Sequence, residues 1–303
     1  MTFSTRKTIS GLLSLPIALA LVLTSCSKFE GDQTVPAFIR VDSIGLKITS
    51  IDQGSKSAYI SDAWIFVDDE LIGAFELPCL VPVLYQGNHS VTVKPGIRLN
   101  GLINLRSAFP LFTSITQNMR LVPDSVTVVK GSVINGKVTP MVQYAETTTI
   151  EVTEAFEDAF YVFDTTTNSQ LDMSLTPSGT PFTFEGDHSG MVTLSDTLTY
   201  FEMYTDEKYT LPRQSTPVFL EMDYMTSIPI TIGVYSYSSS EIIQHPVLVL
   251  TDMPKWQKVY VNLTPIVSSQ TSATSFRIFI GANRLESDPA GTVYLDNIKL
   301  IHQ

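Results

Sequence analysis

The chain has 303 residues, and 44% of them are hydrophobic, a composition typical of a protein that folds around a core. Its 30 acidic and 19 basic residues give a net charge of −11, so we expect no nucleic-acid partner and no peripheral binding to anionic lipid, because both need basic patches. The length favours two domains.

The N-terminus has the pattern of a signal peptide. Arg6 and Lys7 form a positive region, and the apolar stretch 12–23 that follows is shorter than the about 20 residues of a membrane-spanning helix. Small residues then precede Cys26. Residues 1–25 are therefore predicted to be a signal peptide, with an uncleaved anchor as the alternative.

The residues around the predicted cut, Leu23-Thr24-Ser25-Cys26, resemble a lipobox, the mark of bacterial lipoproteins. The resemblance implies that the Cys26 thiol is acylated and that residues 26–38 form a lipidated tether, so that the chain is bound to a membrane. Cys79 is then left without a disulfide partner. A plain secretory signal is the alternative.

Two acidic residues follow the predicted lipidation site closely. Glu30 and Asp32 resemble the acidic export signal of Bacteroidetes lipoproteins, although Lys28 interrupts the acidic run. The resemblance implies a lipid-anchored protein of the outer membrane, at the cell surface. An ordinary solvated linker is the alternative, and the membrane face stays open between surface and periplasm.

From residue 39 onward the sequence has the pattern of β-structure. Residues 40–48 largely alternate apolar and polar, as a half-buried strand does. Residues 63–75 contain an apolar run, an acidic turn and a returning strand, which predict a hairpin. Residues 82–93 contain two further runs around Gly87-Asn88, and this turn type predicts a second hairpin.

Residues 63–96 resemble small β-sandwich modules of the PEGA type. Their pattern is an acidic turn around Val-Asp-Gly and, further on, Gly-x-His-x-Val-x-Val. Val67-Asp68-Asp69 and residues 87–93 fit this pattern, with Asp69 in place of the usual glycine. The resemblance implies a binding or spacer module without catalysis, and residues 39–145 are predicted to form an N-terminal β-sandwich domain.

Two apolar features of this domain each allow two interpretations. Cys79 stands in an apolar segment, which favours a buried, inert thiol over a nucleophile. The irregular segment 97–112 includes the apolar stretch Phe109–Phe112, which is expected to be part of the core, with a docking surface as the alternative.

The second domain is predicted to span residues 146–303. Residues 154–160 are either a short helix or the first strand and turn of this domain. From residue 180 no periodic window of helix length occurs, and short strands such as 219–224 and 293–300 alternate with turn residues. The whole chain is therefore predicted to be all-β, with a small sandwich followed by a β-sandwich jelly roll.

Four segments of this half resemble, in order, the galactose-binding-like jelly rolls, the fold of many carbohydrate-binding modules. They are residues 184–190, 219–224, 256–264 and 293–300. The resemblance implies a carbohydrate ligand and places Trp256 in the core. It does not identify the ligand, because a fold does not determine a function.

The same resemblance implies two sites. The first is a structural Ca²⁺ site with Glu185 and Asp296 as carboxylate ligands; the alternative is a solvated Glu185 and a turn-capping Asp296. The second is a sugar-binding face, for which Tyr235 and Tyr237 qualify because side chains two apart share one face of a strand. Ordinary sandwich tyrosines are the alternative. Further candidates for this face are Tyr200, Tyr204, Tyr209 and Arg284.

No motif of an enzyme is present, so no catalytic residue is predicted. Gly-x-Ser-x-Gly, His-Glu-x-x-His and Gly-rich phosphate loops are absent, and the four histidines lack metal-ligand spacing. The carboxylate clusters 68–70 and 154–158 could do acid–base chemistry on glycosides, but clusters on turns are expected to be solvated.

A short motif concerns modification. Four hydroxyl residues stand in motifs that resemble the Asp-Ser/Thr-apolar sites of O-glycosylation in Bacteroidetes: Ser43, Ser125, Thr165 and Thr197.

These observations leave two functions of different classes. The first is a surface-associated lipoprotein that acts as a non-catalytic binding or accessory module, with carbohydrate as the candidate ligand. The alternative is a structural lipoprotein subunit of an outer-membrane protein assembly or secretion complex, with a barrel protein as the partner. A glycosidase or other hydrolase is disfavoured by the missing motifs.

Overall fold

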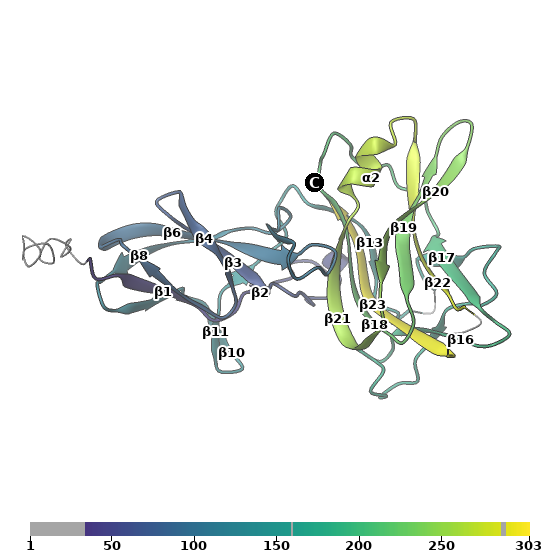
Figure 1. Ribbon diagram of the computed structural model, residues 1–303, viewed down its shortest axis with the longest axis horizontal. Coiled ribbons are helices and arrows are strands. Elements are labelled where there is room, and N and C mark those ends of the chain that lie inside the picture. The colour runs from purple at the N-terminus through teal and green to yellow at the C-terminus, as the bar shows by residue number, and fades with distance from the viewer. Residues whose placement is uncertain (1–33, 159, 286–288) are drawn as a thin grey trace, which may run out of the picture.

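The computed structural model describes residues 34–158, 160–285 and 289–303, and in them it shows two β-sandwich domains (Figure 1). The predicted signal peptide, Cys26 and most of the predicted tether lie outside the described residues. Within the described part of the chain no helix is long and apolar enough to cross a membrane. The predicted all-β fold is confirmed.

The N-terminal domain consists of twelve strands and one short 3-10 helix, η1 (Ile51–Gln53). The strands are β1 (Ala37–Val41), β2 (Gly45–Leu46), β3 (Asp62–Val67), β4 (Glu70–Glu76), β5 (Cys79–Val83), β6 (Gly87–Arg98), β7 (Arg106–Ala108), β8 (Ile115–Leu121), β9 (Val126–Val128), β10 (Ser132–Ile134), β11 (Lys137–Thr139) and β12 (Met141–Val142).

Two sheets enclose the core of this domain. One has the order β5-β1-β9, and the other has the order β4-β3-β6-β7, with β8 also paired to β6. Alternate residues of their strands point inward; Ile39, Ile65 and Val93, for example, are fully buried. This alternation follows from the pleat of a strand and accounts for the period-two pattern in the sequence.

The predicted hairpin over residues 63–75 is confirmed, because β3 pairs with β4 in antiparallel fashion. Its turn residues Asp68 and Asp69 both have positive φ, at 49° and 68°, as a tight hairpin turn requires. The second predicted hairpin, over residues 82–93, is wrong. β5 pairs with β1, whereas β6 pairs with β3 and β8, so the chain changes sheets at Gly87.

The C-terminal domain consists of eleven strands and, among the described residues, one α-helix. These elements are β13 (Thr149–Glu154), β14 (Phe163–Thr165), β15 (Ser174–Leu175), β16 (Gly190–Leu194), β17 (Tyr200–Thr205), β18 (Val218–Thr226), β19 (Ile230–Tyr237), β20 (Ile242–Leu250), β21 (Met253–Asn262), α2 (Thr264–Ser269), β22 (Ser275–Asn283) and β23 (Gly291–His302).

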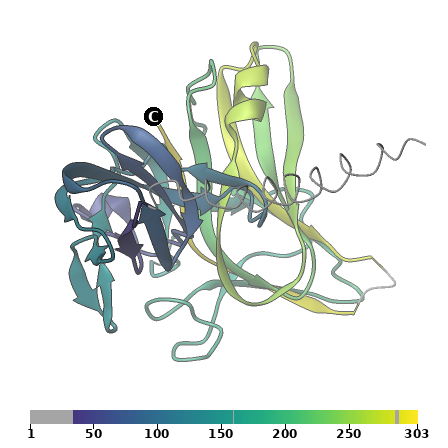
Figure 2. The ribbon, with the colours of Figure 1, turned by 60° about the vertical axis from the view of Figure 1, so that its left-hand side comes forward.

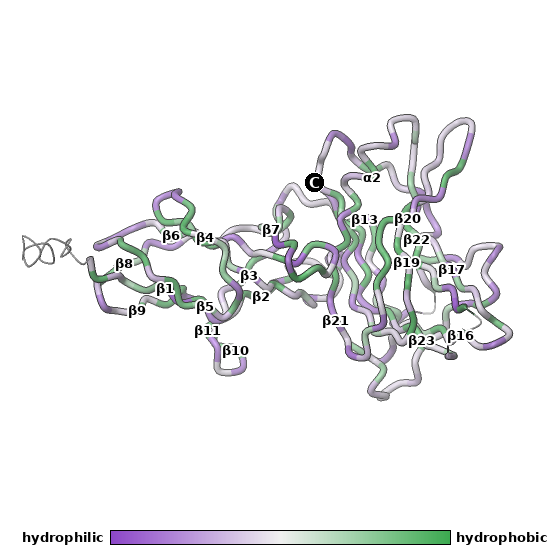
Figure 3. The backbone as a smooth tube through the Cα atoms, in the orientation of Figure 1, coloured by the Kyte–Doolittle hydropathy of each residue, from purple (hydrophilic) through white to green (hydrophobic). Residues whose placement is uncertain are grey.

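Two antiparallel sheets form this sandwich. Five strands in the order β14-β17-β22-β19-β20 make one sheet, and β15-β16-β23-β18-β21, with β13 also paired to β23, make the other. The hydrophobic segments follow the strands, whereas many loops are hydrophilic (Figure 3). The chain passes back and forth between the sheets, as the predicted jelly roll does.

Of the two alternatives for the start of this domain, the first strand and turn is confirmed, because β13 ends at Glu154 and a loop follows. A six-residue helix, α2, occurs instead after β21, with Pro265 in its first turn; it is too short to produce a periodic pattern.

The two domains lie side by side and contact each other (Figures 1 and 2). The N-terminal domain packs on the outer face of β18, β21 and β23, and Phe219, Tyr260 and Ile301 of that face belong to its hydrophobic cluster. Phe109 contacts Phe219 and Tyr260, with ring centroids 5.0 and 5.1 Å apart. Phe109 is thus buried, as expected for the apolar stretch, but the core it joins is shared by both domains.

Candidate functional site

The outer face of the β14-β17-β22-β19-β20 sheet carries the residues predicted for ligand binding. In register, Tyr235 of β19 lies between Arg277 of β22 and Gln244 of β20. β17 lies on the far side of β22. The name tyrosine face is used below for the outward side chains of these strands, which are Tyr200, Glu202, Tyr204, Tyr235, Tyr237, Gln244 and Arg277.

A buried carboxylate lies at the centre of the tyrosine face. Glu202 is only 3% exposed, although it points to the outer side of the sheet. Tyr235 Oη donates to Glu202 Oε1 at 2.7 Å, and Gln244 Nε2 donates to Glu202 Oε2 at 2.5 Å. These bonds fix the positions of three side chains that come from three different strands, as a preformed binding surface requires.

Burial and this carboxylate together perturb the neighbouring phenols. Burial raises the pKa of Tyr200 to about 12, and hydrogen bonding to Glu202 adds to the effect. The pKa of Tyr235 is raised as well, first by burial and then by its hydrogen bond to Glu202. Both hydroxyl groups therefore stay protonated at neutral pH and act as hydrogen-bond donors.

Cations and aromatic rings alternate around this centre. The Arg277 guanidinium lies 4.3 Å from the Tyr204 ring centroid, and its Nη2 donates to the Asp206 carbonyl at 2.6 Å. Lys208 Nζ lies 4.1 Å from the centroid of Tyr237. The face therefore offers flat apolar rings beside fixed donors and acceptors.

One glycine shapes the face. Gly233 pairs with Phe279 across β19 and β22, and a Cβ atom at Gly233 would collide with the Phe279 ring. The absent side chain lets this ring lie against the sheet beneath Tyr235, with centroids 5.3 Å apart. Tyr235 is thereby supported from below.

Two other predicted candidates lie elsewhere. Tyr209 bridges to Phe276, an inward-facing residue, and packs against the core of the sandwich. Arg284 is buried, and its Nη2 donates to Asp196 Oδ1 at 2.6 Å. The structure therefore unites four of the six predicted side chains. Sequence reasoning missed Glu202, Gln244 and Arg277, whose only signal was the alternation within each strand.

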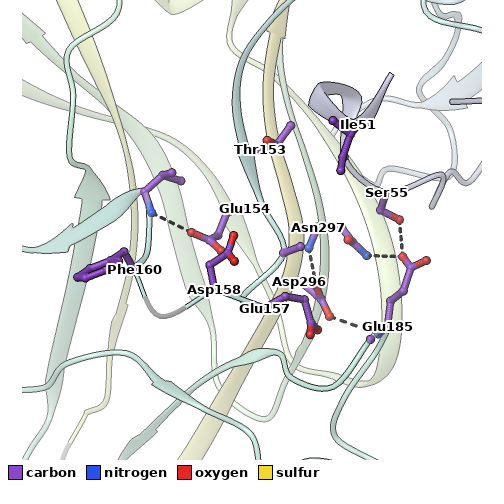
Figure 4. A pocket seen from close by; sticks show the side chains of 14 residues that line it. Ile51, Ser55, Thr153, Glu154, Glu157, Asp158, Phe160, Glu185, Asp296 and Asn297 are labelled. Carbon is purple, nitrogen blue, oxygen red and sulfur yellow. Dashed lines mark hydrogen bonds between the residues drawn. The ribbon is translucent and has the colours of Figure 1, made fainter. Parts of the chain in front are cut away.

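A pocket at the domain junction contains the residues predicted to bind Ca²⁺. It has a volume of about 490 Å³ and is lined by both domains (Figure 4). Ser55 and the Asn297 amide both donate to Glu185 Oε2, the amide at 3.2 Å. Asp296 Oδ2 accepts from Ser189 Oγ at 2.6 Å and lies 3.4 Å from the Glu185 amide nitrogen.

Protein donors thus point at the carboxylate oxygens that a cation would need. Asp296 Oδ1 also accepts from the backbone N–H of Asn297 at 2.7 Å. Ca²⁺ takes six to eight oxygen ligands, so binding by Glu185 and Asp296 would need further oxygens and stays a prediction. Among the described residues, no group of three or more His, Cys, Asp or Glu side chains is placed to hold a metal.

Burial dominates the electrostatics of this pocket. Asp296 is 1% exposed, and burial raises its pKa from 3.8 to about 7, against the lowering effect of its hydrogen bonds. Glu154 lines the same pocket, is 6% exposed, and has a pKa raised by burial.

The expectation that residues 154–158 are simply solvated is wrong for Glu154, which is buried. Glu154 accepts from the amides of Phe156 and Val162 at 2.7 and 2.8 Å. Glu157, which is exposed, accepts from the amide of His188 at 3.0 Å. These carboxylates bind backbone donors of irregular loops and so shape the pocket rim.

A buried polar chain joins the domains beside this pocket. Lys299 Nζ donates to the Ser55 carbonyl and, at 3.1 Å, to Tyr144 Oη, which in turn donates to Glu221 Oε2 at 2.9 Å. Burial lowers the pKa of Lys299 to about 8 and raises that of Glu221. These hydrogen bonds link β18 and β23 to the loop between η1 and β3 and to the segment between the domains.

The remaining predicted residues lie as follows. Cys79 is half-buried, and burial raises the pKa of its thiol, which makes it a poor nucleophile. Of the predicted O-glycosylation sites, Ser125 and Thr197 are exposed in turns, Thr165 is half-buried in β14, and the Ser43 hydroxyl is hydrogen bonded to Thr139 Oγ1 at 2.7 Å.

Trp256 is placed differently from its prediction. It is half-buried and outside both hydrophobic clusters, so its assignment to the core was wrong. Trp256 alternates with Gln257 on β21 and shares the outer side of its sheet with Lys258 and Tyr260, two and four residues on. The inward side is taken by Val259 and Val261.

Comparison with known proteins gives structural neighbours only. No family model and no curated protein matches the chain. Among solved structures, it is similar to the tandem CBM22-1–CBM22-2 domain of Paenibacillus barcinonensis Xyn10C, at 14% identity and TM-score 0.38, with 54% of this chain and 52% of that one covered. It therefore spans about half the length of that tandem.

Two further neighbours are also carbohydrate-binding modules. A structure described as a carbohydrate-binding module of the β-sandwich superfamily matches at 15% identity and TM-score 0.38, covering 89% of this chain and 99% of that one. The xylan-binding CBM22-2 domain of Paenibacillus barcinonensis Xyn10C matches at 14% identity and TM-score 0.37, covering 50% and 99%. At these sequence identities and TM-scores, the matches do not identify a ligand for this chain.

Proposed function

We propose that this chain is a non-catalytic carbohydrate-binding protein and that it holds its glycan on the tyrosine face. The observation that carries the proposal is the constellation around Glu202, where Tyr235 and Gln244 from neighbouring strands converge on one buried carboxylate. Sugars present apolar CH faces that stack on aromatic rings and hydroxyl groups that need fixed polar partners. The face supplies both within one sheet.

The residues have separate roles in this proposal. Tyr204 and Tyr235, whose ring centroids are 6.1 Å apart at 80°, provide two differently oriented planes for successive sugar units. Arg277 and Gln244 provide polar groups whose positions are set by neighbouring side chains rather than by the ligand, and the buried Glu202 holds Gln244 and Tyr235 in place. Such preorganisation lowers the entropy cost of binding.

Isothermal titration calorimetry with cello-, xylo-, manno- and galactohexaose tests the proposal. Tyr235→Ala removes one aromatic plane and the hydrogen bond that Tyr235 donates to Glu202, so we expect about tenfold or greater loss of affinity for the hexasaccharide that binds the wild type. Tyr85→Ala is the matched control, because Tyr85 also donates to a glutamate, Glu70, at 2.7 Å, but lies in the other domain. Wild-type affinity in Tyr235→Ala would contradict the proposal.

We also propose that the chain is anchored by acylated Cys26 in the outer membrane, at the cell surface. The support is the sequence pattern of residues 1–32. Cys26→Ser is expected to release the protein from sedimented membranes, whereas Cys79→Ser should leave it there. Membrane retention of Cys26→Ser would overturn the anchor.

The alternative function, a structural subunit of an outer-membrane assembly or secretion complex, is favoured by one observation. The loop between β6 and β7 exposes three large apolar side chains: Leu102 at 53%, Ile103 at 63% and Leu105 at 45%. Purification of the tagged protein in mild detergent should then bring down a barrel protein, and Ile103→Ser should weaken that copurification. Recovery of the wild type as a lone monomer would count against this function.

A further inference from the structure

A second pocket opens on the opposite sheet of the C-terminal sandwich, where the two domains meet. It has a volume of about 460 Å³ and takes residues from both domains. Tyr59 and Arg98 contribute from the N-terminal domain, and Phe184, Asp223, Trp256 and Lys258 contribute from the C-terminal domain. These six residues define the junction groove.

The floor of the junction groove is a buried ion pair. Lys258 Nζ lies 3.2 Å from Asp223 Oδ2, and the two side chains are 3% and 1% exposed. The side-chain amide of Asn297 donates to the same oxygen at 3.2 Å, and this bond holds the carboxylate in place. The groove therefore presents a fixed ammonium donor beside a fixed carboxylate acceptor, a spacing that suits two neighbouring hydroxyl groups.

The walls are aromatic and only partly covered by protein. Phe184 is 37% exposed and Tyr59 is 43% exposed, and Trp256 is half-buried. The Phe184 and Trp256 centroids are 5.2 Å apart at 52°, so the two rings form a corner instead of a stack. Arg98 lies over the Tyr59 ring at 5.8 Å from its centroid. Exposed ring surface is therefore available to a flat apolar ligand face.

From this geometry we infer that the junction groove is a second carbohydrate-binding site, which takes a short segment of a glycan. Its aromatic corner stacks against a sugar ring while Lys258 and Asp223 bind the hydroxyl groups. The volume lies within the range of small-molecule sites, about 300–1,000 Å³. The jelly roll by itself lacks this site, because Tyr59 and Arg98 belong to the other domain.

This inference goes beyond the proposed function and does not depend on it. The junction groove and the tyrosine face lie on opposite sheets of one sandwich, so a chain with both sites occupied joins two glycan strands. Such bivalency raises the apparent affinity for a dense polysaccharide without any new contact.

Fluorine NMR of protein labelled with 5-fluorotryptophan tests the groove directly, since the chain has two tryptophans, Trp64 and Trp256. Trp64 does not line the groove and is the internal reference. The probes are cello-, xylo-, manno- and galactohexaose. We expect one of them to shift the Trp256 resonance in a saturable way and to leave the Trp64 resonance in place.

Three variants separate the sites. Phe184→Ala should weaken the affinity measured at the Trp256 resonance about tenfold, whereas Tyr85→Ala, which removes a ring of the N-terminal domain outside the groove, should not. Tyr235→Ala should leave the Trp256 response intact. If no probe shifts the Trp256 resonance, the junction groove is not a carbohydrate site, whatever the tyrosine face binds. The same holds if the shift is abolished by Tyr235→Ala but kept in Phe184→Ala. A shift that survives Tyr235→Ala upholds the groove even if the face proves inactive.

Discussion

Replacement of Asp296 by asparagine should make the protein more stable at alkaline pH and should flatten its pH dependence. Asp296 lines the pocket at the domain junction that also contains Glu185. It is 1% exposed, and burial raises its pKa from 3.8 to about 7. Between those values the folded state holds a proton that the unfolded chain has released. The free energy of unfolding therefore falls as pH rises through this window.

The magnitude follows from the two pKa values. The full penalty for the ionised carboxylate is on the order of 4 kcal/mol, since each pKa unit corresponds to about 1.4 kcal/mol. Integration of the same linkage relation gives about 2.5 kcal/mol between about pH 5 and about pH 8. Asparagine cannot titrate, so the stability difference between Asp296→Asn and the wild type should grow in favour of the variant by this amount.

Urea denaturation of both proteins at several pH values measures this difference. Any change in hydrogen bonding to Ser189 or Asn297 shifts the variant by a constant at all pH values, so only the pH-dependent part tests the reasoning. Asp252→Asn, at an exposed aspartate between β20 and β21 and outside the pocket, is the control and should run parallel to the wild type. Parallel curves for Asp296→Asn and the wild type would refute the assignment of a buried, proton-retaining carboxylate.

Three further outcomes follow from the structure. Tyr260→Phe should destabilise the protein by about 1–3 kcal/mol in urea denaturation, because it removes the hydroxyl that accepts from the Tyr59 amide at 3.2 Å; equal stability would mean that water replaces the bond. Millimolar Ca²⁺ should leave the melting temperature unchanged, since protein donors already bind the carboxylates of Glu185 and Asp296; a rise of several degrees would support the predicted Ca²⁺ site. If the native protein carries O-glycans, Ser125→Ala and Thr197→Ala should each lower its intact mass by one glycan, because both hydroxyl residues are exposed in turns; an unchanged mass would remove that residue from the predicted sites.

Part of the candidate site could be predicted from the sequence because strand periodicity is a local property. Tyr235 and Tyr237 share one face of β19 since side chains two apart on a strand always do, and the same holds for Tyr200 and Tyr204 on β17. The hairpin turn at Asp68-Asp69 was equally local, because its residues set the backbone conformation by themselves.

Which strands lie next to one another was not predictable in this way. β17 and β19 are both neighbours of β22, which comes some forty residues after β19 in the chain, and only this order brings Glu202 within hydrogen-bonding distance of Tyr235. The Gly87-Asn88 turn shows the same limit, because β5 finds its partner in β1 rather than in the adjacent β6.

The sequence by itself thus determined that the chain is all-β, where many of its strands lie and which side chains share a strand face, because each of these depends on residues close together along the chain. Only the tertiary structure decided that Trp256 borders a groove instead of filling a core, and that Phe109 packs between two domains. The reason is that burial is settled by the element that covers a face, and for β21 that element lies more than a hundred residues earlier in the sequence.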